Sequence, residues 1–412
     1  MYDKKDVVGP GIGYQDLRLM EDCPPTDQKL VAQHNWDSPP YNRWSFQHMS
    51  QLFPVAAIHR GSAKVTELPR RERMLDAVSF KLLNGQQTDL ISFLNDTYTD
   101  GFMVLHRGAV ASEQYFNGML PHTLHLLQSV SKTLVGTLTG ILIGQGKIDP
   151  EMTVRDYVPE LDGCGYGDAS VQDVLDMRTG VKFNEDYTNP NAEFIQLDIA
   201  SGWRERGDRT SPDSIYDLLK SIPKERNHGE YFQYRSVDTD VLGWICERAG
   251  GKRLAALLSE EIWSKLGAEQ DANITLDSVG TALADGGVSA CLRDLARFAQ
   301  MHLQGGKFNG HQIVPESFIA ACGRGSTPAF EVLNRGYVEH LPNAAYSNQC
   351  WVLDSERGIY SARGVFGQMI YIDPQSDTVI IKLSSWPDFT NLEWTINTYR
   401  ACAAITEELQ RD

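Results

Sequence analysis

Alternating and continuous apolar runs place strands near both ends of the chain. Residues 102–116 hold two such runs on either side of Arg107, which predicts a β-hairpin. Strand patterns return only late, in residues 358–362, 368–373 and 378–384. A turn over residues 374–377 separates the last two runs, so we expect neighbouring antiparallel strands there.

Apolar positions between these ends recur with helical spacing. Residues 1–75 are irregular and rich in Pro, Gly, Asn and Gln, apart from a helical pattern over residues 42–53. Residues 155–282 are mainly helical with long connections. The helices we expect after the hairpin cover residues 130–143, 170–177, 213–220, 239–249, 254–266, 291–303 and 391–409.

This order of elements predicts an α/β chain of the α+β type. Strands from both termini would complete one antiparallel sheet flanked by helices, with an all-helical insertion between them. We therefore expect an α/β domain built from residues 1–155 and 283–412. Residues 156–282 would form a mainly helical domain, with the active site in the cleft between the two.

Composition narrows the classes of function. The 412 residues are 42% hydrophobic, and the net charge is −16, with no basic cluster. Such a surface repels nucleic acid and anionic membranes, so neither is an expected partner. The first ten residues lack the apolar core of a signal peptide, which favours a cytoplasmic protein. Seven scattered cysteines without a C-x-x-C predict neither disulfides nor a zinc site.

The strongest chemical feature is the pair Ser129 and Lys132 at the start of the apolar helix over residues 130–143. Residues three apart on a helix lie on one side, a turn above each other. A serine needs a neighbouring base to act as a nucleophile. A lysine in an apolar pocket can serve, because burial lowers its pKa. S-x-x-K is typical of serine β-lactamases and penicillin-binding proteins.

The same spacing also arises by chance, and Ser221 and Lys224 repeat it. Pro223 lies between these two residues and would break a helix. Charged residues flank them, so we expect a loop without chemistry there. The apolar helix that follows Ser129 distinguishes the two matches.

Tyr234 and Ser236 are the predicted partners of the serine–lysine pair. They lie between an extended segment, residues 230–233, and the start of a helix, so their side chains can face a cleft. Tyr234 could shuttle a proton to a leaving group. Taken alone, Tyr234 is one of 16 tyrosines and Ser236 an ordinary helix cap. The upstream pair favours the functional interpretation.

Residues 361–368 are the candidate oxyanion site. They lie on or beside a strand, and Gly364 and Gly367 permit close approach of a backbone. We expect the N–H groups of Ser129 and Val365 to bind the oxyanion of a tetrahedral intermediate. A glycine-containing bend in a strand accounts for the same residues equally well.

Together these blocks resemble the β-lactamase-related serine hydrolases. Their order is Ser-x-x-Lys, then Tyr-x-Ser, then a strand with Gly-x-x-Gly-Gln, and residues 173–181 and 283–298 are similar to two further stretches of that family. The resemblance covers roughly residues 75–400. Within the family, the blocks are most similar to 6-aminohexanoate-dimer hydrolases, the nylon-oligomer hydrolases, which combine amidase and family VIII-type carboxylesterase activity.

The resemblance implies a β-lactamase/penicillin-binding-protein-like fold and an acyl-enzyme mechanism on a small amide or ester. Ser129 would attack the carbonyl, and Lys132 would take its proton directly or through Tyr234. Tyr234 would then protonate the leaving group, and Ser236 would hydrogen-bond Lys132. No metal or organic cofactor is expected, and a homodimer is the assembly to test.

Two further residues are substrate-binding candidates. Tyr187 lies in the irregular stretch 183–191 and is a candidate lid residue, although an exposed loop tyrosine is an equally good description. Gly364 could let a substrate approach the strand backbone closely.

Two departures from the penicillin-recognising pattern argue against β-lactam hydrolysis. Ala362-Arg363-Gly364 stands where those relatives carry Lys-Thr-Gly, and Arg363 is expected on the opposite face of the strand. Ser236 replaces a common Asn. A β-lactamase or D,D-peptidase is the alternative enzyme, and a catalytically silent binding protein is the alternative of another class. Retention of Ser129, Lys132 and Tyr234 together favours catalysis.

Overall fold

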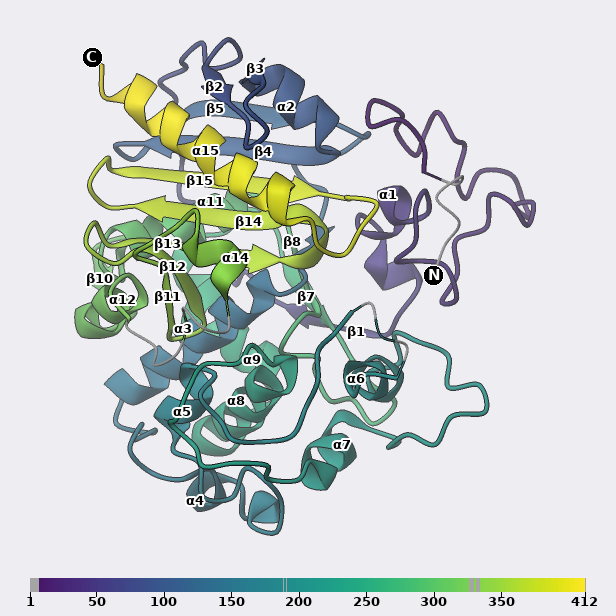
Figure 1. Cartoon of the computed structure of the whole chain (residues 1–412), viewed down its shortest axis with the longest axis vertical. Coiled ribbons are helices and arrows are strands. Elements are labelled where there is room, and N and C mark those ends of the chain that lie inside the picture. The colour runs from purple at the N-terminus through teal and green to yellow at the C-terminus, as the bar shows by residue number, and fades with distance from the viewer. Residues whose placement is uncertain (1–6, 188, 190, 326–329, 331–333, 412) are drawn as a thin grey trace.

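The computed structural model describes residues 7–187, 189, 191–325, 330 and 334–411. A seven-stranded antiparallel sheet dominates it, in the order β11-β12-β13-β14-β15-β4-β5 (Figure 1). The predicted joining of strands from both ends of the chain is confirmed, because β15 pairs with β4. The strands are β4 (Thr99–His106), β5 (Ala109–Tyr115), β11 (Ala345–Ser347), β12 (Cys350–Asp354), β13 (Ile359–Gly364), β14 (Gln368–Asp373) and β15 (Thr378–Ser384).

Helices cover both faces of this sheet. Strand residues alternate between the faces. Phe102 and Val104 of β4 pack with α15 (Leu392–Leu409) and α2 (Leu90–Asp96), and Figure 1 shows α15 lying across that face. Met103 and Leu105 belong to the larger core on the other face, with α3 (Val130–Gly144) and α11 (Leu292–Leu303). The predicted hairpin and closing helix are therefore confirmed.

Residues 155–282 are mainly helical, as predicted. In this region α8 lies against α3, the helix that begins after Ser129. The division into two domains stays a prediction. The elements here are α4 (Val154–Tyr157), η3 (Pro159–Leu161), α5 (Val171–Leu175), α6 (Phe194–Ala200), α7 (Ile215–Ser221), α8 (Ser236–Gly250), α9 (Leu254–Leu258), η4 (Ser259–Trp263) and α10 (Ser264–Leu266).

A second, four-stranded antiparallel sheet was not predicted. Its order is β1-β7-β8-β6. Its strands have two to four residues, too short for a period to show: β1 (Val55–Ile58), β6 (His125–Leu126), β7 (Ala272–Thr275) and β8 (Val288–Ala290). The remaining elements are α1 (Asn42–Ser45), η2 (Met49–Gln51), β2 (Ser79–Lys81), β3 (Gln87–Asp89), β9 (Lys307–Phe308), β10 (His311–Gln312), α12 (Glu316–Cys322), α14 (Arg335–Val338) and η5 (Val365–Gly367).

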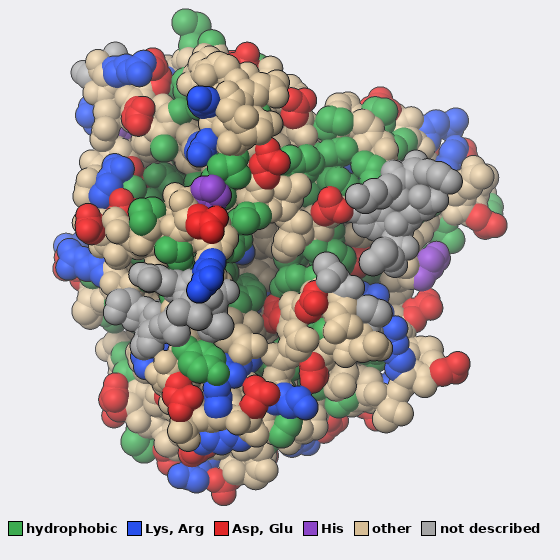
Figure 2. Space-filling view, in the orientation of Figure 1, with side chains coloured by type: hydrophobic (Ala, Val, Ile, Leu, Met, Phe, Trp, Pro, Cys, Tyr) green, Lys and Arg blue, Asp and Glu red, His purple; other side chains and the backbone are tan. Residues whose placement is uncertain are grey.

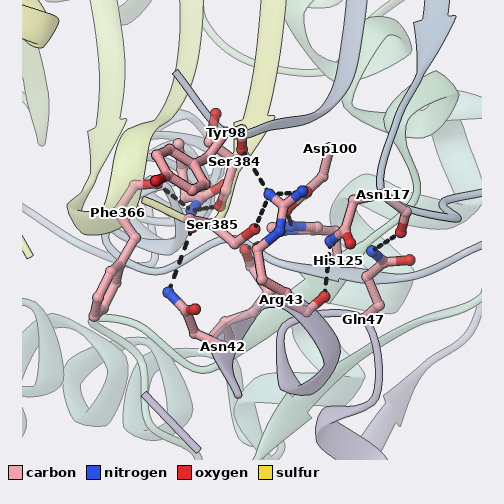
Figure 3. A network of polar contacts seen from close by, with 12 residues as sticks. Asn42, Arg43, Gln47, Tyr98, Asp100, Asn117, His125, Phe366, Ser384 and Ser385 are labelled. Atoms are coloured by element: carbon pink, nitrogen blue, oxygen red, sulfur yellow. Dashed lines mark hydrogen bonds and ion pairs between the residues drawn. The ribbon is translucent and has the colours of Figure 1, made fainter. Parts of the chain in front are cut away.

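A buried polar network joins the N-terminal segment to the sheet (Figure 3). Arg43 of α1 donates to Asp100 of β4 and to Ser385 at distances of 3.2 and 3.0 Å. The other Asp100 oxygen lies 3.0 Å from Nε2 of His125 in β6. Nearby, Phe46 packs against Phe366 of η5 with 5.0 Å between ring centroids. The irregular N-terminal region thus supports the turn that follows β13.

Candidate active site

Ser129 and Lys132 contact each other as their spacing predicts. Ser129 is the N-cap residue of α3, immediately after β6 and a short turn. Lys132 lies one turn further and donates from Nζ to the Ser129 hydroxyl at 2.9 Å. Ser129 is 8% exposed and Lys132 only 1% exposed, so the pair is almost removed from water.

The pKa of Lys132 is raised rather than lowered, contrary to the expectation from the sequence. Burial does act to lower the pKa of Lys132, but the charges of the Asp285 and Glu185 carboxylates and the hydrogen bond to Asp285 outweigh it, so that the pKa is raised. Lys132 Nζ lies 3.1 Å from Oδ2 of Asp285 and also donates to the Asp285 carbonyl at 2.9 Å. Lys132 is therefore a charged ammonium group fixed by Asp285 rather than a neutral amine.

Tyr234 completes the contact with the nucleophile. It precedes α8, as predicted, and its ring centroid lies 5.3 Å from Lys132 Nζ. Its phenol lies next to the Ser129 side chain, which acts on the pKa of Tyr234 as a hydrogen-bond donor and lowers it. Burial raises the pKa of Tyr234, and the charge of Lys132 only partly opposes this, so the phenol is neutral at pH 7. The ring stacks on Trp351 with a centroid distance of 5.4 Å.

Ser236 and Glu185 form the next layer around the lysine. Ser236 accepts a hydrogen bond from Lys132 at 3.0 Å, which is the predicted contact. Its hydroxyl donates to Glu185 at 2.8 Å, and Glu185 also accepts from the Tyr187 hydroxyl at 2.5 Å. Burial raises the pKa of Glu185. Tyr187 lines the cavity and stacks on Phe389, so it is not an ordinary exposed loop residue.

The end of β13 passes close to the start of α3. A Cβ atom on Gly364 would lie 2.7 Å from the Leu127 carbonyl oxygen and 3.0 Å from the Ser129 nitrogen. Only glycine permits that approach. Val365 follows directly and lines the cleft beside Ser129. The two predicted oxyanion donors therefore come from chain segments that meet at Gly364.

The cleft has a wide and a narrow part, and both reach Ser129. The wide part is a cavity of about 440 Å3 that extends toward α14 and α15. Figure 2 shows a hollow on this face of the molecule with hydrophobic side chains around it. The narrow part runs past Tyr187 to Trp203 and Asp198. Burial raises the pKa of Asp198 to about 7, against the opposing charge of Arg204.

Sequence reasoning missed several residues of this site. Arg363 alternates away from Ala362 as expected, yet it lines the same cavity as Ser129, which sequence reasoning did not predict. Asp285 lies within residues 283–298, and Glu185 is two residues before Tyr187. Nothing in their spacing indicates contact with Lys132, which depends on chain segments far apart in sequence.

The decoy motif has no comparable surroundings. Ser221 ends α7 and donates to the Leu218 carbonyl, while Lys224 pairs with Asp168. The expectation of a loop at Pro223 is therefore confirmed. Among the described residues there is no cluster of three or more metal-ligating side chains, and no helix long and apolar enough to cross a membrane.

Comparison with known proteins identifies the class. The beta-lactamase family matches residues 94–404, and the chain belongs to that family. A 6-aminohexanoate-dimer hydrolase of Paenarthrobacter ureafaciens is 41% identical over 361 residues, which cover 87% of this chain and 89% of that protein. A solved structure from Bacillus anthracis, described as a putative 6-aminohexanoate-dimer hydrolase, superposes with a TM-score of 0.84. Its sequence is 30% identical, and the match covers 94% of this chain and 99% of that one.

A more distant structure agrees in fold alone. A family VIII carboxylesterase superposes with a TM-score of 0.55 at 16% identity, covering 75% of this chain and 93% of that one. The predicted fold and the predicted resemblance to 6-aminohexanoate-dimer-hydrolase-like serine hydrolases are confirmed. The chain is a hydrolase of the beta-lactamase family.

Proposed function

We propose that the protein hydrolyses the amide bond of a small linear substrate through an acyl-enzyme on Ser129. The observation that carries the proposal is the contact of one hydroxyl with both Lys132 and Tyr234 at the mouth of a cavity. A nucleophile, a proton carrier and a cation within hydrogen-bond reach are the parts that acyl transfer requires.

The charges of the site support one order of proton transfers during acylation. Ser129 Oγ attacks the amide carbon, and its proton passes to the Tyr234 oxygen. The phenolic proton of Tyr234 passes to the leaving nitrogen, so the amine departs neutral. Lys132 keeps its proton and stabilises the negative charge that develops on the serine and phenol oxygens. The N–H groups of Ser129 and Val365 bind the carbonyl oxygen as it becomes an oxyanion.

Deacylation uses the same groups in reverse. A water molecule attacks the acyl-enzyme carbonyl, and its proton passes through Tyr234 to Ser129 Oγ. The ester bond to the serine breaks, and the acid product leaves. Ser236 accepts a hydrogen bond from the Lys132 ammonium and helps to keep it in place, and Glu185 in turn accepts from the Ser236 hydroxyl.

Acidic side chains around Ser129 support a substrate with an amine on its acyl side. Asp198, which pairs with Arg204, lines the narrow part of the cleft, and Glu185 lines the wide part beside Tyr187. The similar Paenarthrobacter protein is named for 6-aminohexanoate dimer, a linear amide with an ammonium at one end and a carboxylate at the other. We propose the same type of substrate for this chain.

The first prediction tests the nucleophile with a matched control. Ser129→Ala should lower hydrolysis of 6-aminohexanoate dimer by at least about four orders of magnitude, because only the attacking oxygen is lost. Ser221→Ala, which alters the decoy pair, should leave activity near that of the wild type. Rates are measured by release of 6-aminohexanoate, and circular dichroism checks the fold.

Comparable losses in the two variants, or a loss in neither, would contradict the assignment. A nitrocefin assay separates the alternatives of a β-lactamase and a D,D-peptidase, for which β-lactam turnover or acylation should exceed amide hydrolysis. A silent binding protein would turn over neither substrate and would not be labelled by a serine-directed fluorophosphonate. Cytoplasmic localisation and a homodimer remain proposals, tested by cell fractionation and light scattering.

A further inference from the structure

Arg363 of β13 has an aromatic environment inside the active-site cavity. Its guanidinium carbon lies 4.3 Å from the centroid of Trp351 and 4.6 Å from that of Tyr337. The guanidinium also donates to the Tyr337 hydroxyl. Two aromatic faces and a phenol therefore fix the orientation of this cation, which is costly to arrange for a side chain with so much rotamer freedom.

No acidic side chain among the described residues forms an ion pair with Arg363. Burial opposes its charge, and only tyrosines, namely Tyr337, Tyr399 and Tyr234, act in the other direction. An arginine in a protein does not lose its proton. A largely buried cation without a counter-ion is unfavourable, so an anion that enters the cavity would gain a strong partner.

The cavity itself is polarised. Glu185 is the one acidic side chain among the described residues that line it, and it lies at the Ser129 end. Arg363 and Arg335 also line the cavity, and Arg335 belongs to α14 together with Tyr337. An acid near the nucleophile and cations toward α14 match a linear substrate whose two ends carry opposite charges.

We propose that Arg363 binds a carboxylate on the leaving-group side of the scissile amide. The planar fork of a guanidinium matches a carboxylate by two parallel hydrogen bonds. In a dimer of an amino acid the acyl part carries the ammonium and the leaving amine carries the carboxylate. The carboxylate end therefore occupies the wide cavity, where Arg363 lies. The placement of the carboxylate on the leaving-group side rests on the proposed amide hydrolysis.

The test compares two substrates that differ only at that end: 6-aminohexanoate dimer and the same dimer with a terminal carboxamide. The wild type should favour the carboxylate by roughly ten- to a hundredfold in kcat/KM, because one charge-assisted bidentate contact is lost in the amide. Arg363→Met keeps an unbranched apolar stem but removes the guanidinium, and it should abolish the preference through KM, while hydrolysis of the carboxamide changes little. Arg209→Met, an exposed arginine, should retain the preference.

A binding measurement keeps the inference independent of turnover. Calorimetry with Ser129→Ala protein should show 6-aminohexanoate binding at least about tenfold more tightly than 6-aminohexanamide, and the difference should vanish in Ser129→Ala/Arg363→Met. Equal binding of the two, or an equal loss of both substrates in Arg363→Met, would overturn the role of Arg363. Absence of hydrolysis with a retained carboxylate preference would instead overturn the proposed reaction.

Discussion

At the scale of single residues, two opposing effects act on the Lys132 ammonium group. Burial favours the neutral amine, and the Asp285 carboxylate at 3.1 Å favours the charged form and prevails together with Glu185. Asp240 supports this arrangement, because its carboxylate accepts hydrogen bonds from the backbone N–H groups of Ala284 and Asp285. Asp285 acts through Lys132 and is a positioning residue.

A pH profile tests this role. With Asp285→Asn the raising effect is removed and burial lowers the pKa of Lys132, so the ammonium loses its proton at lower pH. We expect the fall in kcat on the alkaline side to begin at a lower pH in Asp285→Asn than in the wild type, when kcat is measured from pH 6 to 11. Asp217→Asn, at the exposed start of α7, should leave the profile unchanged. An unchanged limb in Asp285→Asn, or a wild type that gains activity as a lysine of lowered pKa deprotonates, would contradict a charged Lys132.

At the scale of secondary structure, close packing on one face of α3 holds Ser129 and Lys132 in place. A Cβ atom on Gly140 would lie 2.6 Å from the ring of Phe318 in α12, a distance that real contacts do not reach. The glycine therefore allows the two helices to approach. This close packing, rather than helix propensity, determines the residue at position 140.

Gly140→Ala provides the test, because two effects have opposite signs. Alanine favours the helix by about 1 kcal/mol over glycine. Overpacking against Phe318 costs about 1–3 kcal/mol. We expect net destabilisation of up to about 2 kcal/mol in urea unfolding. Gly140→Ala/Phe318→Leu should recover most of the loss by freeing space, and a more stable Gly140→Ala single variant would contradict the close contact.

At the scale of the whole molecule, one buried lysine makes the free energy of unfolding depend on pH. Lys382 of β15 donates to Ser384 at 2.5 Å and to the Thr97 carbonyl at 3.3 Å. Burial lowers its pKa to about 7, although the charge of Asp100 acts the other way. In the unfolded chain the pKa is about 10.4. Between these values the unfolded state binds the extra proton, so this group makes stability rise with pH.

Lys382→Met should remove that dependence. At pH 7 and below, the wild type carries the full cost of the buried charge, so the variant should be more stable by on the order of 1–3 kcal/mol after loss of the two hydrogen bonds. The difference should shrink as the pH approaches 10. Thermal unfolding at pH 6, 8 and 10 measures it, with exposed Lys81→Met as the control. A gain that is constant with pH would show that Lys382 does not titrate in this range.

The sequence by itself determined the elements whose signals are local. The apolar run after Ser129 predicts α3, and the two runs around Arg107 predict the β4–β5 hairpin, because helical and alternating periods persist over many residues. The contact between Ser129 and Lys132 follows from helix geometry alone. The two-residue β6 and three-residue β8 gave no such signal, so the second sheet was not predicted.

Only the tertiary structure decided the charges and the substrate-binding end of the site. Asp285 reaches Lys132 across 153 positions of sequence, and Glu185 reaches Ser236 across 51. Arg363 alternates away from Ala362 along β13, yet the cavity continues to Trp351 and Tyr337 and includes it. A pKa depends on every charge and on burial within several ångströms. That environment is assembled by folding, and no local pattern in the chain contains it.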